Sequence, residues 1–396
     1  MRVIFVFLLF WMPHLAAYTP VIMPNGSTLP WTMEDGVKVF HLVAEPVHQE
    51  FAPDVWIDCW GYNGQTPGPV IEAVEGDRVR ILVTNHLPEP TTVHWHGLIL
   101  PNGMDGVTGL NQAPIPPGET FKYEFTLVQN GTYMYHPHFD EMTEIGMGLM
   151  GFFIIHPKKE EEPRIDRDYV IMLHEWFIPP GATTPDSSVM LDFNYFTFNG
   201  TVWPTTEPML AQLNERVRVR IGNLSMDSHP IHFHGHTFTV TGTGAGKIPS
   251  SAQYEDVTVN VAVGSVRDIE FIANNPGDWA FHCHKTHHLM NAMGHGTPNM
   301  LGVNLQHVEE RLRKLIPGYM SMGETGMGEM FDEHHQHMPR PPNFSRLGSP
   351  GQFGTIDMSG MFTVVKIREK IEDNQDPGWY ENPEGTVASP VRGCQD

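Results

Sequence analysis

Hydrophobic and polar residues alternate along several short segments of the chain, most clearly in RVRILV (78–83) and RVRVRI (216–221). A period of two is typical of half-buried β-strands, because successive side chains of a strand point to opposite faces. The 396 residues include 34 prolines and 38 glycines, which favour turns between such segments. The pattern therefore predicts an all-β fold built from many short strands.

Two parts of the chain resemble each other, which indicates an internal repeat. YNGQTPGPVIEAVEGDRVRILVTN (62–85) is echoed by FNGTVWPTTEPMLAQLNERVRVRIGN (198–223), and GETFKYEF (118–125) is echoed by GSVRDIEF (264–271). The repeat spans roughly residues 36–160 and 167–310, with the charged segment PKKEEEPRIDRD as a linker. We therefore predict two homologous β-sandwich domains, residues 18–160 and 161–310.

The two ends of the chain differ from this repeat. Residues 1–17 combine Arg2, an apolar run and two small alanines, which is typical of a secretory signal peptide, although a buried first strand is the alternative. Residues 311–396 form a predicted C-terminal extension with a Met- and His-rich segment (318–342) and one expected strand (361–369). We expect an exported protein, periplasmic or secreted, and the sequence leaves open whether Cys59 and Cys394 form a disulfide.

The net charge of the chain limits the kinds of molecule that it is expected to bind. The chain has 24 Lys and Arg residues against 46 Asp and Glu residues, a net charge of −22. This balance argues against binding to nucleic acid or to an anionic membrane surface, and it favours a soluble protein. The 23 histidines and 23 methionines are more than a β-sandwich needs for packing.

Four pairs of histidines lie two residues apart, at equivalent positions of the repeat. The pairs are His94 and His96, His136 and His138, His232 and His234, and His282 and His284. Residues two apart on a strand point to the same face, so each pair directs both imidazoles to one place. Imidazole is a good copper ligand, and we expect the pairs to converge on a cluster of copper ions.

Cys283 lies between the two histidines of the last pair. On a strand its side chain points away from His282 and His284, so the cysteine can bind one metal centre while the histidines bind another. His229, His288 and Met293 complete the ligand set of a blue-copper electron-transfer site, two histidines and a cysteine with a weak axial methionine. The segment is therefore expected to relay electrons between two centres.

These motifs resemble those of a known family. HWHG (94–97), HPH (136–138), HPIHFHGH (229–236) and HCHKTHHLMNAM (282–293) resemble, in order, the copper-ligand motifs of multicopper oxidases, the laccase family. The resemblance covers roughly residues 36–305 and implies two cupredoxin-like Greek-key β-sandwich domains. It also implies four copper ions in each functional unit: one of type 1, one of type 2 and two of type 3.

The resemblance implies a role for each ligand position. Type 1 copper would be bound by His229, Cys283, His288 and Met293, type 2 copper by His94 and His232, and the type 3 pair by His96, His136, His138, His234, His282 and His284. His287 competes with His288, which the family spacing favours. His236 and His295 have no ligand role in the family pattern and are expected to support the site or the fold.

The first domain lacks a type 1 site. In the repeat, Thr91 lies opposite His229, Pro137 opposite Cys283, Met142 opposite His288 and Met147 opposite Met293. Only about 90 residues separate HPH from HPIHFHG, so the middle domain of three-domain laccases is missing. The chain resembles two-domain laccases with type 1 copper in the second domain. That resemblance implies a homotrimer, with three-copper clusters between domain 1 of one subunit and domain 2 of the next.

The implied activity is oxygen reduction. A reductant would give electrons singly to type 1 copper, and Cys283 would pass them through His282 and His284 to the cluster, where O2 becomes two waters. Asp105 matches the spacing of the acidic residue of the family near type 2 copper and is expected to supply protons, although an ordinary turn aspartate is the alternative.

The reductant stays open at this stage. Laccase-type sites accept phenols and aromatic amines through an exposed edge of a type 1 histidine, here His288. The methionines and histidines of residues 318–338 suggest oxidation of Cu(I) instead, since thioether sulfur favours that ion. A flexible acidic linker with no metal role is the alternative for this segment.

Three other classes compete with the oxidase hypothesis. A copper nitrite reductase carries its type 1 copper in the first domain and has no three-copper cluster, whereas here HCH lies in the second domain. A non-catalytic copper carrier needs soft ligands but no buried array of histidines. A purely structural β-sandwich leaves the matched histidines unexplained.

Overall fold

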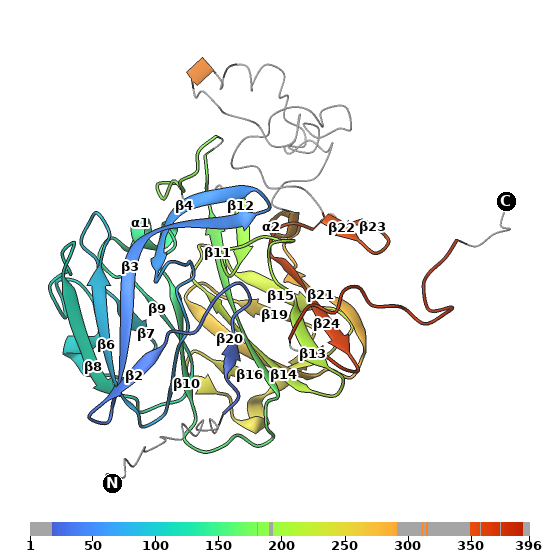
Figure 1. Ribbon diagram of the computed structural model, residues 1–396, viewed down its shortest axis with the longest axis horizontal. Coiled ribbons are helices and arrows are strands. Elements are labelled where there is room, and N and C mark those ends of the chain that lie inside the picture. Colours follow the sequence, from blue (N-terminus) through green and yellow to red (C-terminus); the bar gives the residue numbers. More distant parts are fainter. Residues whose placement is uncertain are drawn as a thin grey trace, which may run out of the picture.

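The computed structural model is built almost entirely from strands (Figure 1). It describes residues 18–179, 181–189, 193–290, 311, 314–315, 349–356, 358–372 and 374–390. The predicted signal peptide, the Met- and His-rich segment and Cys394 lie outside these residues. None of the helices in the described ranges is long and apolar enough to cross a membrane.

The first domain consists of two facing sheets. One sheet has the order β2–β3–β6–β8, with β4 paired to β3, and the other has the order β5–β10–β9–β7. Their bounds are β2 Trp31–Glu34, β3 Val37–Ala52, β4 Val55–Tyr62, β5 Ile71–Val74, β6 Arg78–Asn85, β7 His94–His96, β8 Thr120–Thr126, β9 Gly131–His136 and β10 Gly151–His156. The core between the sheets includes Phe40, Ile81, Trp95, Tyr135 and Phe153, all buried.

The second domain repeats this design with a larger sheet. Its sheets have the orders β1–β11–β14–β20–β16–β17, with β12 on β11 and β18 on β16, and β13–β24–β21–β15–β19. Their bounds are β1 Val21–Ile22, β11 Arg167–Trp176, β12 Tyr195–Phe198, β13 Met209–Gln212, β14 Arg216–Asn223, β15 His229–Phe233, β16 Phe238–Thr243, β17 Gly246–Lys247, β18 Tyr254–Asp256, β19 Thr258–Val261, β20 Ser265–Ile272, β21 Gly277–Cys283 and β24 Phe362–Arg368. A two-stranded sheet, β22 Ser349–Gly351 and β23 Gly354–Ile356, pairs with neither of these sheets but contacts Trp203 of the second domain.

The repeat found in the sequence is also present in the strand register. His94 pairs with His136 across β7 and β9, and His232 pairs with His282 across β15 and β21. A short helix follows β9 in the first domain and β21 in the second: α1 Glu141–Gly146 and α2 Thr286–Met290. The same backbone frame therefore carries both sets of motif residues.

Strand β24 is the strand expected at residues 361–369, but it belongs to the second sandwich. It pairs antiparallel with β21 and parallel with β13, as β10 pairs with β9 and β5 in the first domain. The boundary proposed at residue 310 therefore leaves one strand of this sheet in the C-terminal extension. A distant strand is needed there because β21 and β13 would otherwise each expose an unpaired edge.

The two domains pack sheet to sheet, and Figure 1 places β10 between the strands of the first domain and those of the second. Both faces of β10 and β11 are buried: Phe153 lies in the first core, Leu173 in the second, and Ile154 meets Met172 in a third core between them. Alternating side chains of one strand thus serve two cores. β14 pairs with β11 in the same sheet and also lies between two layers. The segment RVRVRI, which was expected to be half-buried, is therefore buried on both faces.

Candidate metal centre

Three potential metal ligands converge in the second domain. His229 begins β15, Cys283 ends β21 and His288 lies on α2, and we call these residues the Cys283 group. Cys283 Sγ lies 3.7 Å from His229 Nδ1 and 3.8 Å from His288 Nδ1, and the two Nδ1 atoms are 3.1 Å apart. The structure thus brings together three of the four predicted type 1 ligands. The fourth, Met293, lies outside the described residues.

His287 does not join the Cys283 group. Its ring packs at 4.2 Å from that of His288 and at 5.8 Å from that of Phe196, whereas the atoms that converge belong to His229, Cys283 and His288. The reason is helical geometry, since neighbouring residues of a helix point in directions about 100° apart. Between the two rivals, the geometry favours His288.

The far side of each imidazole meets a polar partner. Ser225 Oγ lies 2.7 Å from His229 Nε2, and Glu175 Oε1 lies 3.8 Å from His229 Nε2 and 3.6 Å from His288 Nε2. Such partners fix the ring orientation and the tautomer of a ligand histidine. Glu175 is buried, and its Oε1 atom has no hydrogen-bond partner.

His288 differs from the sequence expectation of an exposed edge. Its ring is only 1% exposed because Phe196 from β12 stacks on it at 4.1 Å and Glu175 lies behind it. Asp227 Oδ2 lies 3.7 Å from His288 Nε2, and the Asp227 side chain is half-exposed. Asp227 is therefore the solvent-accessible acidic residue next to His288 of the Cys283 group.

Burial sets the protonation of the Cys283 group. Loss of solvent lowers the pKa of His229 to about 3 and that of His288 to about 2, so both imidazoles are neutral at physiological pH and can bind a metal. The same desolvation raises the pKa of the Cys283 thiol to about 12. A thiolate at this position therefore needs a cation beside it.

The first domain gathers the four histidines of HWH and HPH, which we call the domain 1 histidines: His94, His96, His136 and His138. His94 contacts the rings of the other three at centroid distances of 5.3–5.9 Å, and His96 Nδ1 lies 3.3 Å from His136 Nε2. Desolvation lowers the pKa of His136 to about 3, which keeps this imidazole neutral. The four rings can therefore share metal ions.

Two acidic residues border the domain 1 histidines. The Asp105 carbonyl accepts a hydrogen bond from His94 Nδ1 at 2.8 Å, and its carboxylate lies 3.6 Å from the same atom. Glu141 on α1 lies 3.8 Å from His136 and 3.7 Å from His138. Asp105 therefore lies beside a candidate ligand, as its expected role requires.

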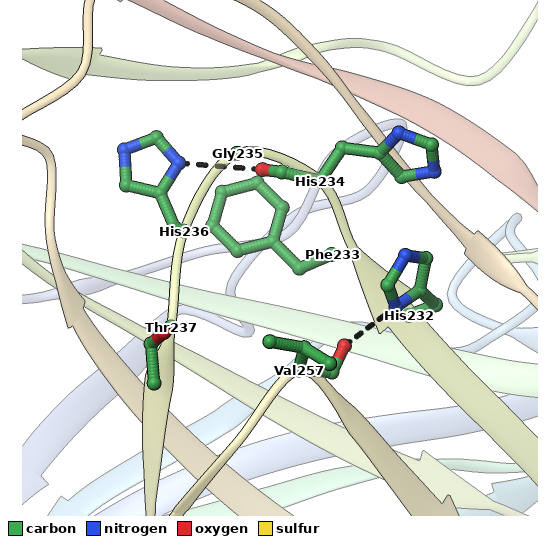
Figure 2. Close-up of a pocket in the computed structure, with 7 residues that line it drawn as sticks. All are labelled: His232, Phe233, His234, Gly235, His236, Thr237 and Val257. Atoms are coloured by element: carbon green, nitrogen blue, oxygen red, sulfur yellow. Dashed lines mark hydrogen bonds between the residues drawn. The ribbon is translucent and has the colours of Figure 1, made fainter.

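The second domain gathers a matching set, the domain 2 histidines: His232, His234, His282 and His284. His232 contacts the rings of the other three at 4.8–5.6 Å, and His234 Nε2 lies 3.1 Å from His282 Nε2. His232 Nδ1 binds the Val257 carbonyl at 2.7 Å (Figure 2), and His282 Nδ1 binds the Cys283 carbonyl at 2.9 Å. These bonds hold the Nδ1 side of each ring and turn its Nε2 side toward the other histidines of the set.

His232 and His234 line an open pocket of about 390 Å³ together with His236. His236 stacks on Phe233 at 4.9 Å and lies away from the ligand pair in Figure 2. This contact is consistent with the supporting role expected for His236. His295 lies outside the described residues.

The two histidine sets remain separate within one chain. Among the described residues, each ring of a set contacts only rings of its own set, apart from the contact of His282 with Phe362. Within one chain, the eight histidines therefore form two groups and not one.

Four residues around the Cys283 group were not predicted from the sequence: Glu175, Phe196, Ser225 and Asp227. Glu175 had a signal, since it is an acidic residue inside the apolar strand YVIMLHEW. Ser225 and Asp227 precede HPIHFHG in an ordinary loop, and Phe196 resembles any core residue. Only the fold places these three beside His229 and His288.

Comparison with known proteins supports the motif analysis. Two sequence profiles described as multicopper oxidase match residues 44–160 and 179–299. Copper resistance protein A of Pseudomonas syringae pv. tomato is 44% identical over 114 residues, 29% of this chain and 18% of that protein. Laccase-1 of Cryptococcus neoformans var. grubii is 42% identical over 120 residues, 29% of this chain and 19% of that protein. The chain thus spans less than a fifth of each.

A third relative aligns over more of the chain. A probable nitrite reductase–hydroxylamine oxidoreductase fusion protein of Kuenenia stuttgartiensis is 28% identical over 276 residues, 66% of this chain and 31% of that protein.

Solved structures share the fold. The multicopper oxidase mgLAC has a TM-score of 0.58 and 32% identity, covering 64% of this chain and 81% of that one. The blue copper oxidase of Nitrosomonas europaea has a TM-score of 0.61 and covers 83% and 85%, but at 24% identity it supports the fold alone. The prediction of two cupredoxin-like sandwiches is confirmed. With both profiles matched and copper-type ligand groups in both domains, this chain belongs to the multicopper oxidase family.

Proposed function

We propose that the chain is a laccase-like oxidase that takes electrons singly from a phenolic or similar reductant and uses four of them to reduce O2 to two waters. The arrangement around Cys283 carries this proposal. Cys283 packs in the domain 2 core with His229 and His288, while His282, the preceding residue of β21, lies among the domain 2 histidines. The peptide backbone is then a short covalent route for electrons between the two groups.

The donor atoms fit copper. A cysteine with two histidines suits type 1 copper, and clusters of neutral imidazoles suit type 2 and type 3 copper. Bound copper would supply one-electron transfer between reductant and O2. The proposed ligands are those of the sequence analysis, with His229, Cys283, His288 and Met293 at type 1. The protein itself contributes ring orientation through the carbonyls of Asp105, Val257 and Cys283.

We further propose that the histidine sets of different subunits complete each other in a homotrimer. The supporting observation is that the two sets lie apart within one chain, and that His234 and His284 are exposed. A head-to-tail contact between domain 1 of one subunit and domain 2 of the next closes a ring. Sedimentation analysis checks this: a monomer with full oxidase activity would contradict it.

A second candidate, oxidation of Cu(I) in copper tolerance, has its own support. Glu175, Asp227 and His288 place ligand atoms within 4.8 Å of one another, and Asp227 is accessible to solvent. The relative named copper resistance protein A points the same way. A copper nitrite reductase is disfavoured because the described cysteine–histidine group lies in the second domain. The role of the Met- and His-rich segment stays a prediction.

Oxygen uptake tests the two candidates. The copper-loaded protein is given a dimethoxyphenol or Cu(I), and the Asp227→Asn variant is compared with Glu255→Gln, which removes an exposed acid on β18. Faster uptake with the phenol, unchanged in Asp227→Asn, supports the laccase-like role. Faster uptake with Cu(I) that falls only in Asp227→Asn supports the second candidate. No uptake with either reductant at full copper occupancy overturns both.

Export is proposed on the N-terminal pattern of residues 1–17. The protein would then work in the periplasm or outside the cell. N-terminal sequencing of the mature protein checks it, since an intact Met1 would contradict cleavage.

A further inference from the structure

A methionine outside the copper-ligand motifs is hydrogen-bonded to two members of the Cys283 group. Met361 immediately precedes β24, and its backbone N–H donates to the His288 carbonyl at 3.0 Å. Its own carbonyl accepts a hydrogen bond from the Cys283 N–H at 3.0 Å. The amide of the preceding Gly360 donates to the Leu289 carbonyl at 2.9 Å. The backbone before β24 therefore joins the end of β21 to α2.

The side chain of Met361 lies on the same face of the sheet as that of Cys283. β21 and β24 are antiparallel and His282 pairs with Phe362, so the next pair in register is Cys283 with Met361. The rings of His282 and Phe362 contact each other on one face, at a centroid distance of 6.4 Å. Because successive side chains alternate between faces, Cys283 and Met361 share the other face, and both are fully buried in the domain 2 core. Residues opposite each other in such a pair have Cβ atoms roughly 4.5–5.5 Å apart.

Cys283 has two cross-strand neighbours on this face, and one of them carries a donor atom. Ile231 of β15 pairs with Cys283 on one side, and Met361 lies opposite it on the other. Isoleucine offers only hydrocarbon, whereas methionine carries a thioether on an unbranched chain with three rotatable bonds. The ligand atoms of the Cys283 group form a triangle with sides of 3.1, 3.7 and 3.8 Å. A blue-copper site adds a weak axial thioether to such a triangle, and Met361 has the sulfur for it.

We propose that Met361 supplies the weak axial sulfur contact to a type 1 copper bound by the Cys283 group. The inference rests on the proposed function and changes one of its ligands. Met361 takes the position that the motif spacing gives to Met293, which lies outside the described residues. The axial ligand then comes from the segment that begins β24, and the same residue holds the backbone of Cys283 and of His288. Copper binding and the pairing of β24 with β21 are thereby linked.

The reduction potential of the blue centre tests this assignment without turnover. Met361→Leu keeps the apolar volume and removes the donor. Cu(II) then loses a ligand, and the potential should rise, by roughly tenfold in the ratio of Cu(I) to Cu(II), which is about 59 mV for one electron. Met361→Gln offers a harder amide oxygen, which favours Cu(II), so the potential should fall by a similar amount. Opposite shifts identify an axial ligand, because a loss of packing alone would move both potentials in the same direction.

Met209→Leu is the matched control. Met209 is a buried methionine of the same core, and on β13 it pairs with Val365, four residues along the chain from Met361. Its substitution should leave the potential and the visible and electron paramagnetic resonance spectra at their wild-type values. The Leu and Gln substitutions are also made at Met293, the residue of the motif.

Wild-type potentials and spectra in both Met361 variants overturn the proposal, and so do shifts of both in one direction. Opposite shifts at Met293 with none at Met361 return the axial position to the motif and overturn it as well. If Met361→Gln does not fold, copper X-ray absorption of Met361→Leu decides: the long contact to sulfur should disappear and the short one to Cys283 should stay, and an unchanged spectrum contradicts the assignment. If the copper-loaded wild-type protein shows the expected shifts but consumes no O2, the proposed oxidase function fails and the assignment of Met361 stands.

Discussion

At the scale of single residues, the candidate metal centre depends on how each imidazole is held. His94, His136 and His282 each place Nδ1 on a backbone carbonyl, at 2.8, 2.9 and 2.9 Å. The Nε2 atoms of His136 and His282 then face a nitrogen of another histidine of their set, where a metal could bind both rings. His229 is held the other way, with Nε2 on Ser225 and Nδ1 facing Cys283. The choice of nitrogen thus follows from the second hydrogen bond of each ring.

Ser225→Ala tests this hold at the Cys283 group. Removing the hydroxyl frees the His229 ring, and losing such an outer partner typically costs roughly 10–100-fold in metal affinity or activity. We expect weaker copper binding at the blue centre, measured by titration of its visible absorption. Thr84→Ala removes a hydroxyl that hydrogen-bonds to Thr120 in the first domain, and it should leave the titration unchanged. Equal affinities in both variants would contradict the prediction.

Asp105→Asn separates the two contacts of Asp105 with His94. The backbone carbonyl that binds His94 Nδ1 is kept, and only the carboxylate is lost. We expect the blue colour to persist and O2 reoxidation to slow by roughly 10²-fold, because the proposed proton donor is removed. Stopped-flow reoxidation of the reduced protein measures it. Unchanged turnover would contradict the proton-donor role and leave Asp105 as an ordinary turn residue.

At the scale of elements, strand β24 supplies both core residues and strand pairing to the second domain. It comes from beyond residue 348, yet it provides Val365 and Ile367 to the domain 2 core and pairs along β21, the strand that carries His282 and Cys283. The Cys283 group therefore depends on a segment that the motifs do not include.

Ile367→Ala should destabilise this domain. Ile367 is fully buried opposite Gly277 and Ala211, and truncating a buried isoleucine typically costs about 2–5 kcal/mol in the free energy of unfolding. Thermal unfolding followed by loss of the blue absorption measures the change. Glu369→Ala, at an exposed position after the strand, is the matched control. Equal unfolding temperatures would mean that β24 contributes little.

At the scale of the whole molecule, buried ion pairs align the two domains. Arg220 donates to both oxygens of Asp168 at 2.8 Å and to Thr132 on β9 of the first domain at 2.7 Å. Arg218 pairs with Glu270 and with Glu161 of the interdomain linker. These bonds fix the relative position of the domains, and with it the faces that carry the histidine sets.

Glu161 makes this alignment sensitive to acid. Burial opposes its ionisation, but the hydrogen bond and charge of Arg218, aided by Lys247, outweigh burial and lower the pKa of Glu161 to about 2. Because the folded-state pKa lies below the unfolded value of about 4.5, the stabilisation is complete above pH ~4.5 and is lost as the pH falls toward 2. Glu161→Gln should therefore lower the free energy of unfolding at pH 6 and narrow the gap from wild type at pH 3. Denaturation curves of both proteins at both pH values measure this difference in the free energy of unfolding. The same difference at pH 6 and pH 3 would contradict the prediction.

The sequence by itself determined the all-β class, the repeat and the set of candidate ligands. Period-two alternation and paired histidines are local patterns, and a strand converts them directly into faces, as with Cys283 opposite His282. Only the tertiary structure decided what lies around those ligands. Glu175, Phe196 and Ser225 reach the Cys283 group from strands and loops far apart in the chain, and β24 joins β21 across a long insertion. Glu144 looks like any surface acid of a short helix until the fold buries it. Packing brings distant residues together, and no local pattern records which ones will meet.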